Sequence, residues 1–207
     1  NIDNRKMSKS LGNFFTVREI SEKYDLQVLR FFMLNAHYRS PLNFSAELMQ
    51  SSKAGLDRIV TAADNLKHLA ASAKDGGMTE SELAHYDASE EFVKKFEEAM
   101  DDDFNTADAI SAIFELVKYL NTHTGADNSK EYLQKCLERL KTLCDILGLV
   151  IEKKEELLDA DVEALIAERQ QARKEKNFAR ADEIRAELLE KGIVLEDTRE
   201  GVKWKRA

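Results

Sequence analysis

Two lysines and two serines near the start of the chain have the types and spacing of an anion-binding loop. Lys6 and Lys9 lie three residues apart with Ser8 between them, and Ser10 follows directly. The ammonium groups are mobile point charges on flexible stems, which suits them to follow a moving pyrophosphate, and the serine hydroxyls add hydrogen-bond donors. Gly12 lets the backbone turn sharply after the loop. These residues predict phosphate binding; a basic, serine-rich loop without a role is the alternative.

The composition predicts a mainly helical protein. The 207 residues suffice for one large or two small domains, 43% hydrophobic residues suffice for a core, and 34% charged residues fit long solvent-facing helices. One proline and eight glycines are few for the many turns that an all-β fold requires. No apolar run approaches the roughly 18 residues of a membrane span and no signal peptide opens the chain, so a cytoplasmic location is expected.

Neither the cysteines nor the acidic run predict a metal site. On one helix Cys136 and Cys144 would lie about 12 Å apart along the axis, beyond disulfide reach, and neither has a partner at zinc-ligand spacing, so both are predicted to be buried thiols. The acidic run 101–103 is more simply explained by Asp103 or Asn105 capping the helix that follows.

Capping residues and helical periodicity predict an antiparallel bundle over residues 45–150. Thr16 with Glu19, Asp25 and Ser45 are the predicted caps. The predicted helices cover 16 to about 24, 25 to about 37, 46–73, 92–100, 110–120 and 133–147. The segment from 74 to about 88 is predicted to be a loop and a candidate hinge.

A charged linker at 151–159 leads to a smaller unit at 160–207, predicted as two helices and a β-hairpin. Net charge is +3 over residues 1–44, −14 over 45–168 and +3 over 169–207. Basic ends around an acidic middle suit a polyanion held at two separate places. An ordinary solvated helical face explains the acidic middle equally well.

Several motifs, in order along the chain, closely resemble those of cysteinyl-tRNA synthetases. They are KMSKSLGNF at 6–14, LRFFML at 29–34, HYRSPL at 37–42, MDDDFNTA at 100–107, ADEIR at 181–185 and GIVLEDT at 192–198. The resemblance covers the whole chain and implies a DALR-type anticodon-binding helical bundle followed by a small helix-hairpin and β-hairpin unit. It divides the chain into the KMSKS loop with connecting stem-contact helices (1–44), the bundle (45–150), a linker (151–159) and an anticodon-recognition domain (160–207).

The resemblance also implies an activity. Such enzymes join cysteine to ATP as cysteinyl-adenylate and then transfer cysteine to the 3′ end of cysteine tRNA. Lys9 would stabilise charge on the departing pyrophosphate, Lys6 would assist, and Ser8 and Ser10 would complete the ATP-binding loop. The family's HIGH signature, nucleotide-binding sheet and zinc ligands would all precede Asn1. The chain is therefore expected to be the C-terminal part of such an enzyme, inactive alone, with no zinc ligands of its own.

The C-terminal unit carries the residues that the resemblance assigns to the anticodon. Arg173, Asp182 and Asp197 match those positions, and arginine and carboxylate side chains can bond the edges of guanine and of cytosine or adenine. Phe178 or Trp204 is a candidate for stacking on a splayed base. Surface ion pairing remains the alternative for the first three residues, and core packing for the two aromatic residues.

Two other functions stay open at this point. A related ligase that joins cysteine to a small amine would use the same activation chemistry, but it would need no anticodon unit. A helical scaffold that binds a protein partner through its bundle would need neither the loop nor the basic C-terminal unit. Selective binding to cysteine tRNA separates the three.

Overall fold

The structure is a computed structural model that describes residues 1–8, 10, 12–14, 16–152, 160–175, 177–190, 193–198 and 201–206. Side chains at 160–163, 190, 194, 196–198 and 201–206 lie outside that description. The chain divides into two compact units, Asn1–Lys153 and Lys154–Ala207. None of the described helices is both long and apolar enough to cross a membrane.

Unit 1 is built of helices that start at polar capping residues, as the sequence predicts. Its elements are α1 (Val17–Ser21), α2 (Leu26–Leu34), α3 (Ala46–Ser72), α4 (Glu80–Ala88), α5 (Glu90–Asp101), α6 (Thr106–His123) and α7 (Lys130–Ile146). Thr16, Asp25 and Ser45 each accept a hydrogen bond from a backbone amide of the first turn that follows. The first two helices end earlier than predicted, at Ser21 and Leu34.

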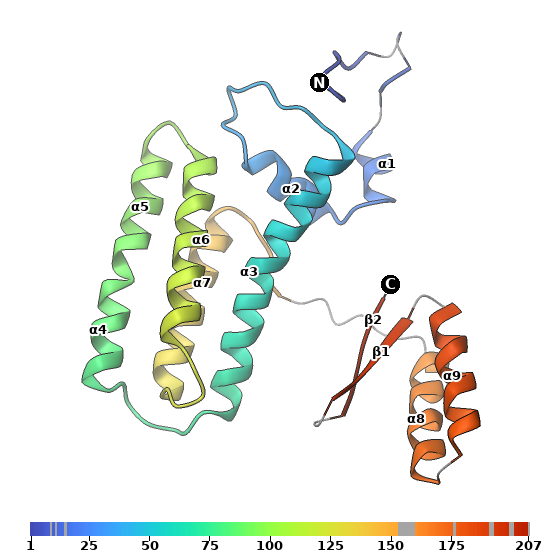
Figure 1. Ribbon diagram of the computed structural model, residues 1–207. Helices are drawn as coiled ribbons and strands as arrows, with labels where there is room; N and C mark the ends of the chain where they lie inside the picture. The colour runs from blue at the N-terminus through green and yellow to red at the C-terminus, as the bar shows by residue number, and fades with distance from the viewer. Residues whose placement is uncertain are drawn as a thin grey trace. The chain divides into compact units, whose positions relative to one another are not determined.

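The long helices form an antiparallel bundle, which confirms the predicted fold class. Helix α3 packs on α7, α5 packs on α6, and α2 packs on the N-terminal part of α3 (Figure 1). Helices α4 and α5 follow one another along one edge in nearly the same direction. The bundle is thus a scaffold that holds α2, and the segments on either side of α2, at one of its ends.

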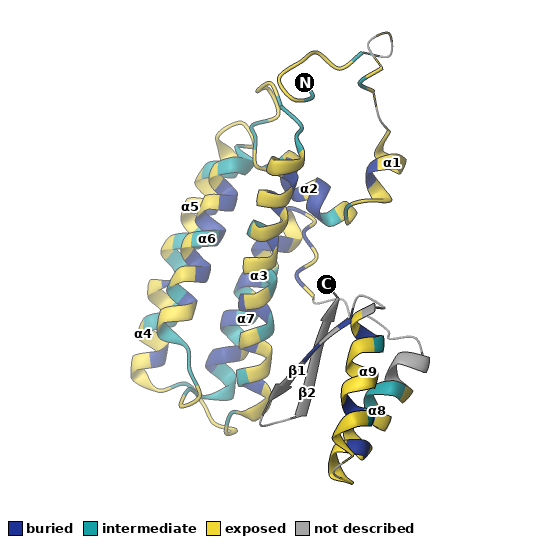
Figure 2. Cartoon of the chain, turned by 45° about the vertical axis from the view of Figure 1, so that its right-hand side comes forward, coloured by how far each residue is buried: buried dark blue, intermediate teal, exposed yellow. Residues whose placement is uncertain are grey.

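The core of unit 1 fills the space between these helices. Buried positions lie along the inner sides of the long helices, while the outer sides are exposed (Figure 2). The largest fully buried ones are Tyr132, Phe31, Phe96, Met49, Ile59, Ile110, Ile113, Leu116, Leu120, Leu133, Leu140 and Leu149. Gly55 lets α2 approach α3 closely, since a Cβ there would lie 3.0 Å from the ring of Phe31.

The prediction of a loop from 74 to about 88 is wrong, because α4 occupies its second half. Thr79 and Glu82 form a capping box in which each side chain bonds the other residue's backbone amide. That Thr-x-x-Glu spacing was visible in the sequence. Helix α4 has no apolar stripe that periodicity could reveal, since its buried residue is the polar Glu82.

Unit 2 contains two helices and a two-stranded antiparallel sheet. Helices α8 (Ala160–Lys174) and α9 (Phe178–Glu190) pack together and precede strands β1 (Ile193–Thr198) and β2 (Gly201–Arg206). Its core is formed mainly by four aliphatic residues, Ile184, Leu188, Ile193 and Leu195, with Leu165 and Ile166 packed against them. In the sheet, Leu195 lies opposite Trp204 and Asp197 opposite Val202.

Candidate functional site

The basic loop near the start of the chain presents its described polar groups to solvent. Lys6 and Ser10 are exposed, Ser8 is partly buried, and the two serine Oγ atoms lie 2.7 Å apart. Gly12 adopts a φ of +66°, so the predicted sharp turn is present, in a conformation that glycine takes without steric cost. Lys9, the lysine predicted to meet the pyrophosphate, lies outside the described residues.

A tight turn fixes the chain immediately before this loop. Asp3 and Asn4 have φ of 45° and 63°, and Ile2 and Arg5 exchange two backbone hydrogen bonds of 2.8 Å. Positive φ at both central residues is the signature of a type I′ turn, which Asp and Asn tolerate better than most residues. The Asp3 amide also donates to the Phe44 carbonyl oxygen at 3.0 Å, so the turn is tied to the segment that leads into α3.

Helix α1 fixes the chain on the other side of the loop. The Glu19 carboxylate accepts from the Thr16 amide at 2.6 Å and from the Thr16 hydroxyl at 2.9 Å. These bonds, the first the larger contribution, lower the pKa of Glu19. Ile20 is the buried residue of this short helix. The exposed basic loop thus lies between two segments that hydrogen bonds hold in place.

A second polar cluster joins the segment after α2 to the turn between α5 and α6. The Tyr38 hydroxyl donates to Asp103 Oδ1 at 2.8 Å, and Arg39 Nη1 lies 3.1 Å from Asp103 Oδ2. The hydrogen bond to Asp103 raises the pKa of Tyr38. His37 stacks on Tyr38 with ring centres 4.8 Å apart. The Asp103 carboxylate is thus engaged by its neighbours.

Asp103 of the acidic run thus serves the turn between α5 and α6. Asn105 caps α6 by accepting from the Asp108 amide, as predicted, while Asp103 and Phe104 take positive φ of 55° and 54°. Among the described residues, no group of three or more His, Cys, Asp or Glu has an arrangement that would hold a metal ion.

Glu82 is a buried carboxylate whose role sequence reasoning missed. Its oxygens accept from the Thr79 amide (2.8 Å), the Ser129 amide (2.7 Å), the Ser129 hydroxyl (2.9 Å) and the Asn128 side chain (3.0 Å). Burial raises the pKa of Glu82, but these hydrogen bonds outweigh it and bring the value to about 2. An acceptor that stays ionised is unsuited to proton transfer; it ties the start of α4 to the start of α7.

The two thiols are buried, as predicted, and chemically inert. Burial raises the pKa of Cys136 to about 11 and that of Cys144 to about 12. Because the thiolate is the reactive form, neither is a nucleophile near neutral pH.

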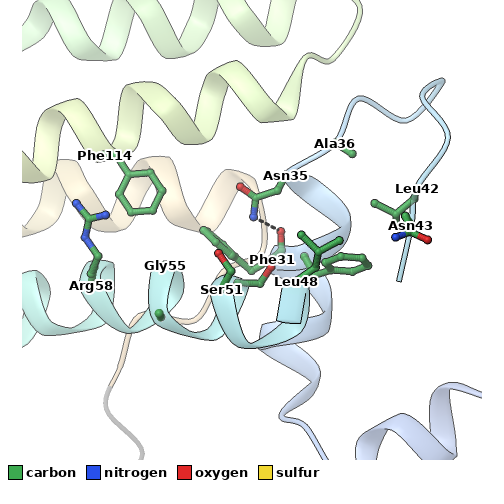
Figure 3. Close-up of a pocket in the computed structure, with 13 residues that line it drawn as sticks. Phe31, Asn35, Ala36, Leu42, Asn43, Leu48, Ser51, Gly55, Arg58 and Phe114 are labelled. Atoms are coloured by element: carbon green, nitrogen blue, oxygen red, sulfur yellow. Dashed lines mark hydrogen bonds between the residues drawn. The ribbon is translucent and has the colours of Figure 1, made fainter. Parts of the chain in front are cut away.

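A groove of about 540 Å³ lies where α2, α3 and α6 meet. Phe31 and Phe114 line it, with Arg58 beside the Phe114 ring and Asn35 bonding the Phe31 carbonyl oxygen (Figure 3). Arg58 is the only ionisable residue among those that line it. Its lining holds no carboxylate, histidine or thiol that could act as a general acid or base or activate the hydroxyls of Ser51 and Ser52.

The predicted anticodon residues lie on the outside of unit 2 wherever the structure describes them. Arg173 is exposed in the last turn of α8, Phe178 begins α9 with 61% of its surface exposed, and Asp182 is exposed one turn later. The four-residue spacing puts Phe178 and Asp182 on one face of α9. Phe178 therefore does not serve as core. Asp197 lies in β1 and Trp204 in β2, but their side chains are outside the described part.

Sequence reasoning also passed over Arg180, which joins the two helices of unit 2. Its guanidinium bonds Glu168 of α8 at 2.9 Å and Glu183 of α9 at 3.1 Å. These contacts, led by the one with Glu168, raise the pKa of Arg180. The visible signal was an arginine among acidic residues, which does not reveal its partner across a turn.

Comparisons with known proteins match all three parts of the chain. Residues 1–54 match the tRNA synthetases class I (C) catalytic domain, residues 95–152 the DALR domain, and residues 155–204 the Cysteinyl-tRNA ligase anticodon binding domain. Similar proteins include those named cysteine–tRNA ligase from Lachnospira eligens (69% identical), Lachnoclostridium phytofermentans (59%) and Clostridioides difficile (50%).

Each of these similarities extends over 100% of this chain and over 44%, 45% and 44% of the respective relative. The chain thus spans less than half the length of the curated relatives that it matches. Identity of this degree from end to end, with the three family matches in order, shows that the chain belongs to the cysteine–tRNA ligase family.

Proposed function

We propose that this chain is the part of a cysteine–tRNA ligase that binds the tRNA and contributes one loop to the site where ATP reacts. The observation that supports this most is the succession of matches along one chain, from a catalytic-domain model at 1–54 to an anticodon-binding model at 155–204. A protein that activates an amino acid and reads a tRNA needs both a catalytic part and an anticodon-binding part.

The proposed reaction has two steps. The cysteine carboxylate attacks the α-phosphorus of ATP, releasing pyrophosphate and forming cysteinyl-adenylate; a ribose hydroxyl at the tRNA 3′ end then takes the cysteinyl group and AMP leaves. Lys9 and Lys6 serve the first step by stabilising the negative charge that grows on the pyrophosphate. The exposed Lys6 and the adjacent hydroxyls of Ser8 and Ser10 support this role.

Unit 2 supplies the anticodon contacts in this proposal. The exposed side chains of Arg173, Asp182 and Phe178 supply two kinds of hydrogen-bonding group and a stacking surface. Asp197 and Trp204 belong to the adjoining strands. The net charge of +3 over residues 169–207 attracts the tRNA backbone and adds affinity independent of sequence.

The decisive experiment compares cognate cysteine tRNA with the same tRNA carrying a swapped anticodon. Arg173→Ala and Asp197→Asn are each expected to cost about 1–3 kcal/mol on the cognate tRNA and much less on the swapped one. Arg185→Ala is the matched control, because Arg185 is also exposed in unit 2 but has no assigned base contact. Titrations at two salt concentrations measure the affinities.

Equal losses on both tRNAs, with a shallower salt dependence, would mean that these residues only neutralise phosphates. The chain by itself is expected to give no cysteine-dependent exchange of pyrophosphate into ATP, so binding is the readout that suits it. The match of residues 155–204 to an anticodon-binding model argues against the small-amine ligase, which has no use for such a unit.

A further inference from the structure

Asn13 makes two hydrogen bonds that close the loop carrying Lys6. Its Oδ1 accepts from the Ser8 amide at 2.9 Å, and its Nδ2 donates to the Lys6 carbonyl oxygen at 3.0 Å. The two bonds meet the backbone on either side of Met7, whose own side chain is 44% exposed. One planar amide thereby sets the path of the backbone at the start of the loop.

Asparagine is the residue type that this position requires. The bonds need one acceptor and one donor on the same planar group, which a carboxamide has and a carboxylate lacks. Only one orientation of the amide satisfies both backbone groups, so the network also fixes which atom is oxygen. Gly12, with its φ of +66°, turns the chain so that the next residue faces back to the loop.

Lys6 consequently lies between two fixed points. On one side is the turn at Asp3 and Asn4, whose amides donate to Phe44 O at 3.0 Å and Asn43 Oδ1 at 2.8 Å. On the other side is the Asn13 amide. The lysine side chain extends from a backbone position held at both ends, although the side chain itself is exposed.

We infer that Asn13 is a positioning residue for adenylate formation: it holds the backbone from Lys6 to Ser8 so that the Lys6 ammonium and the hydroxyls of Ser8 and Ser10 are oriented before ATP arrives. The inference rests on the proposed function. A charge that is already oriented needs no reorganisation as the pyrophosphate forms, which lowers the barrier to the reaction rather than the affinity for ATP.

The first test measures the loop itself in this chain. Trypsin cleavage after Lys6 reports how often the local backbone opens, provided that opening and closing are fast relative to cleavage. Asn13→Ala loses both bonds and is expected to speed release of the new Met7 terminus by roughly tenfold; Asn13→Asp keeps the bond to the Ser8 amide and is expected to show roughly threefold. Mass spectrometry of the released terminus gives the rates.

Asn35→Ala is the matched control for that measurement. The Asn35 side chain donates to the Phe31 carbonyl oxygen at 2.7 Å, the same kind of bond, but at the end of α2 and away from the loop. Its cleavage rate after Lys6 is expected to stay within about twofold of the parent. An equal rise in Asn35→Ala and Asn13→Ala, or no rise in either Asn13 variant, would overturn the inference.

The second test measures the reaction in a protein of the relatives' full length that carries this sequence. Asn13→Ala is expected to lower kcat for cysteine-dependent ATP–pyrophosphate exchange by about tenfold or more, with the KM for ATP changed by less than about threefold. Active-site titration normalises kcat, so a variant that merely folds less well keeps its normalised kcat. Asn13→Asp is expected to fall between Ala and the parent.

The possible failures are distinguishable. If the parent protein gives no cysteine-dependent exchange, the proposed function is wrong and the inference falls with it. If the parent is active and Asn13→Ala has the parent's normalised kcat, or a raised KM alone, the proposed function stands and the positioning role of Asn13 is overturned.

Discussion

The two units of the chain are stabilised in different ways. Unit 1 (Asn1–Lys153) has a core contributed by all of its long helices, whereas unit 2 (Lys154–Ala207) relies on a small aliphatic cluster around Ile184 and Leu188. Domains of about 50 residues bury a smaller share of their surface than larger domains do and are marginally stable. The larger unit therefore tolerates losses that the smaller one does not.

Each unit has an arginine that joins two of its helices, and these two arginines differ in exposure. In unit 1, Arg139 has 11% of its side chain exposed and bonds Tyr86 O at 2.6 Å, Ser89 Oγ and Glu90 at 2.8 Å, so it joins α7 to the junction of α4 and α5. In unit 2, Arg180 joins the helices from a side chain that is 42% exposed. Partly exposed pairs contribute little, because water and salt screen them. Arg139 is therefore expected to add more to the stability of unit 1 than Arg180 adds to that of unit 2.

The largest expected effect is on the small core. Ile184→Ala removes a side chain with no exposed surface and is expected to cost about 3–5 kcal/mol, enough to unfold a unit of this size. Hydrogen exchange should show lost protection throughout α8, α9 and the hairpin, with the bundle amides unchanged.

Ile113→Ala is the matched control for this prediction, since Ile113 in α6 also has no exposed surface. It should lower the unfolding midpoint of the bundle but leave unit 1 folded at 25 °C. If both variants leave their units folded with similar protection, the proposed difference in stability between the units is wrong.

The next effect concerns the buried cation of unit 1. Arg139→Met keeps the apolar stem but loses the bonds to Tyr86 and Glu90 and the contact of the guanidinium with the Tyr86 ring, 3.8 Å from its centre. We expect a cost of about 2–4 kcal/mol in denaturant unfolding. Lys135→Met is the control, because Lys135 also lies over Tyr86, at 5.8 Å, but is 42% exposed. A similar loss of stability in Arg139→Met and Lys135→Met would contradict the idea that burial makes the Arg139 contacts stronger.

Much of this architecture was readable from the sequence. Apolar spacing predicted the bundle, and the caps at Thr16, Asp25 and Ser45 marked helix starts because a cap is a local signal. Helix α4 was missed since it has no apolar stripe and is held by one polar residue, Glu82, that bonds partners 46 and 47 positions away. Such partners are set by the packing of the bundle.

The candidate site was predictable by residue type but not by geometry. The loop lysines and serines form a motif from which a role could be predicted, whereas the two hydrogen bonds of the Asn13 side chain could not be read from that motif. These bonds depend on the return of the chain after Gly12, which spacing alone does not give. The predicted base contacts of Arg173, Asp182 and Asp197 stay predictions, because such contacts depend on where the bases of a bound tRNA lie.

A third effect is the pH dependence that Glu82 gives to unit 1. Its folded pKa of about 2 lies below the usual 4.5, so ionised Glu82 contributes stability above pH 4.5, and this contribution is lost as pH falls toward 2. Glu82→Gln should cost about 2–3 kcal/mol at pH 7, and the difference from the parent should shrink between pH 4.5 and 2.

Urea unfolding at several pH values measures this dependence. Glu152→Gln is the control: the hydrogen bond from Lys141 lowers the pKa of Glu152, but its side chain is 66% exposed, so the change should be far smaller. A constant difference between Glu82→Gln and the parent at every pH would show that ionisation of Glu82 is not what stabilises the start of α7.

The smallest effect tests the contact of α2 with the end of α7. Gly148 has a φ of +64°, and a Cβ there would lie 2.9 Å from Arg30 Nη1, which donates to the Leu147 carbonyl oxygen at 3.2 Å. Gly148→Ala is therefore expected to cost about 1–2 kcal/mol, part from backbone strain and part from displacing Arg30.

A double-mutant cycle separates the cost of backbone strain at residue 148 from the cost of displacing Arg30. In an Arg30→Ala background only the strain remains, so Gly148→Ala should cost less there than in the parent. Gly125→Ala is the control, because no atom lies within 4 Å of its added Cβ and its φ is not positive. If Gly148→Ala costs the same in both backgrounds, displacement of Arg30 contributes nothing to the loss of stability. A larger cost in the parent would show that the contact of Arg30 with the end of α7 helps to hold α2 against the bundle.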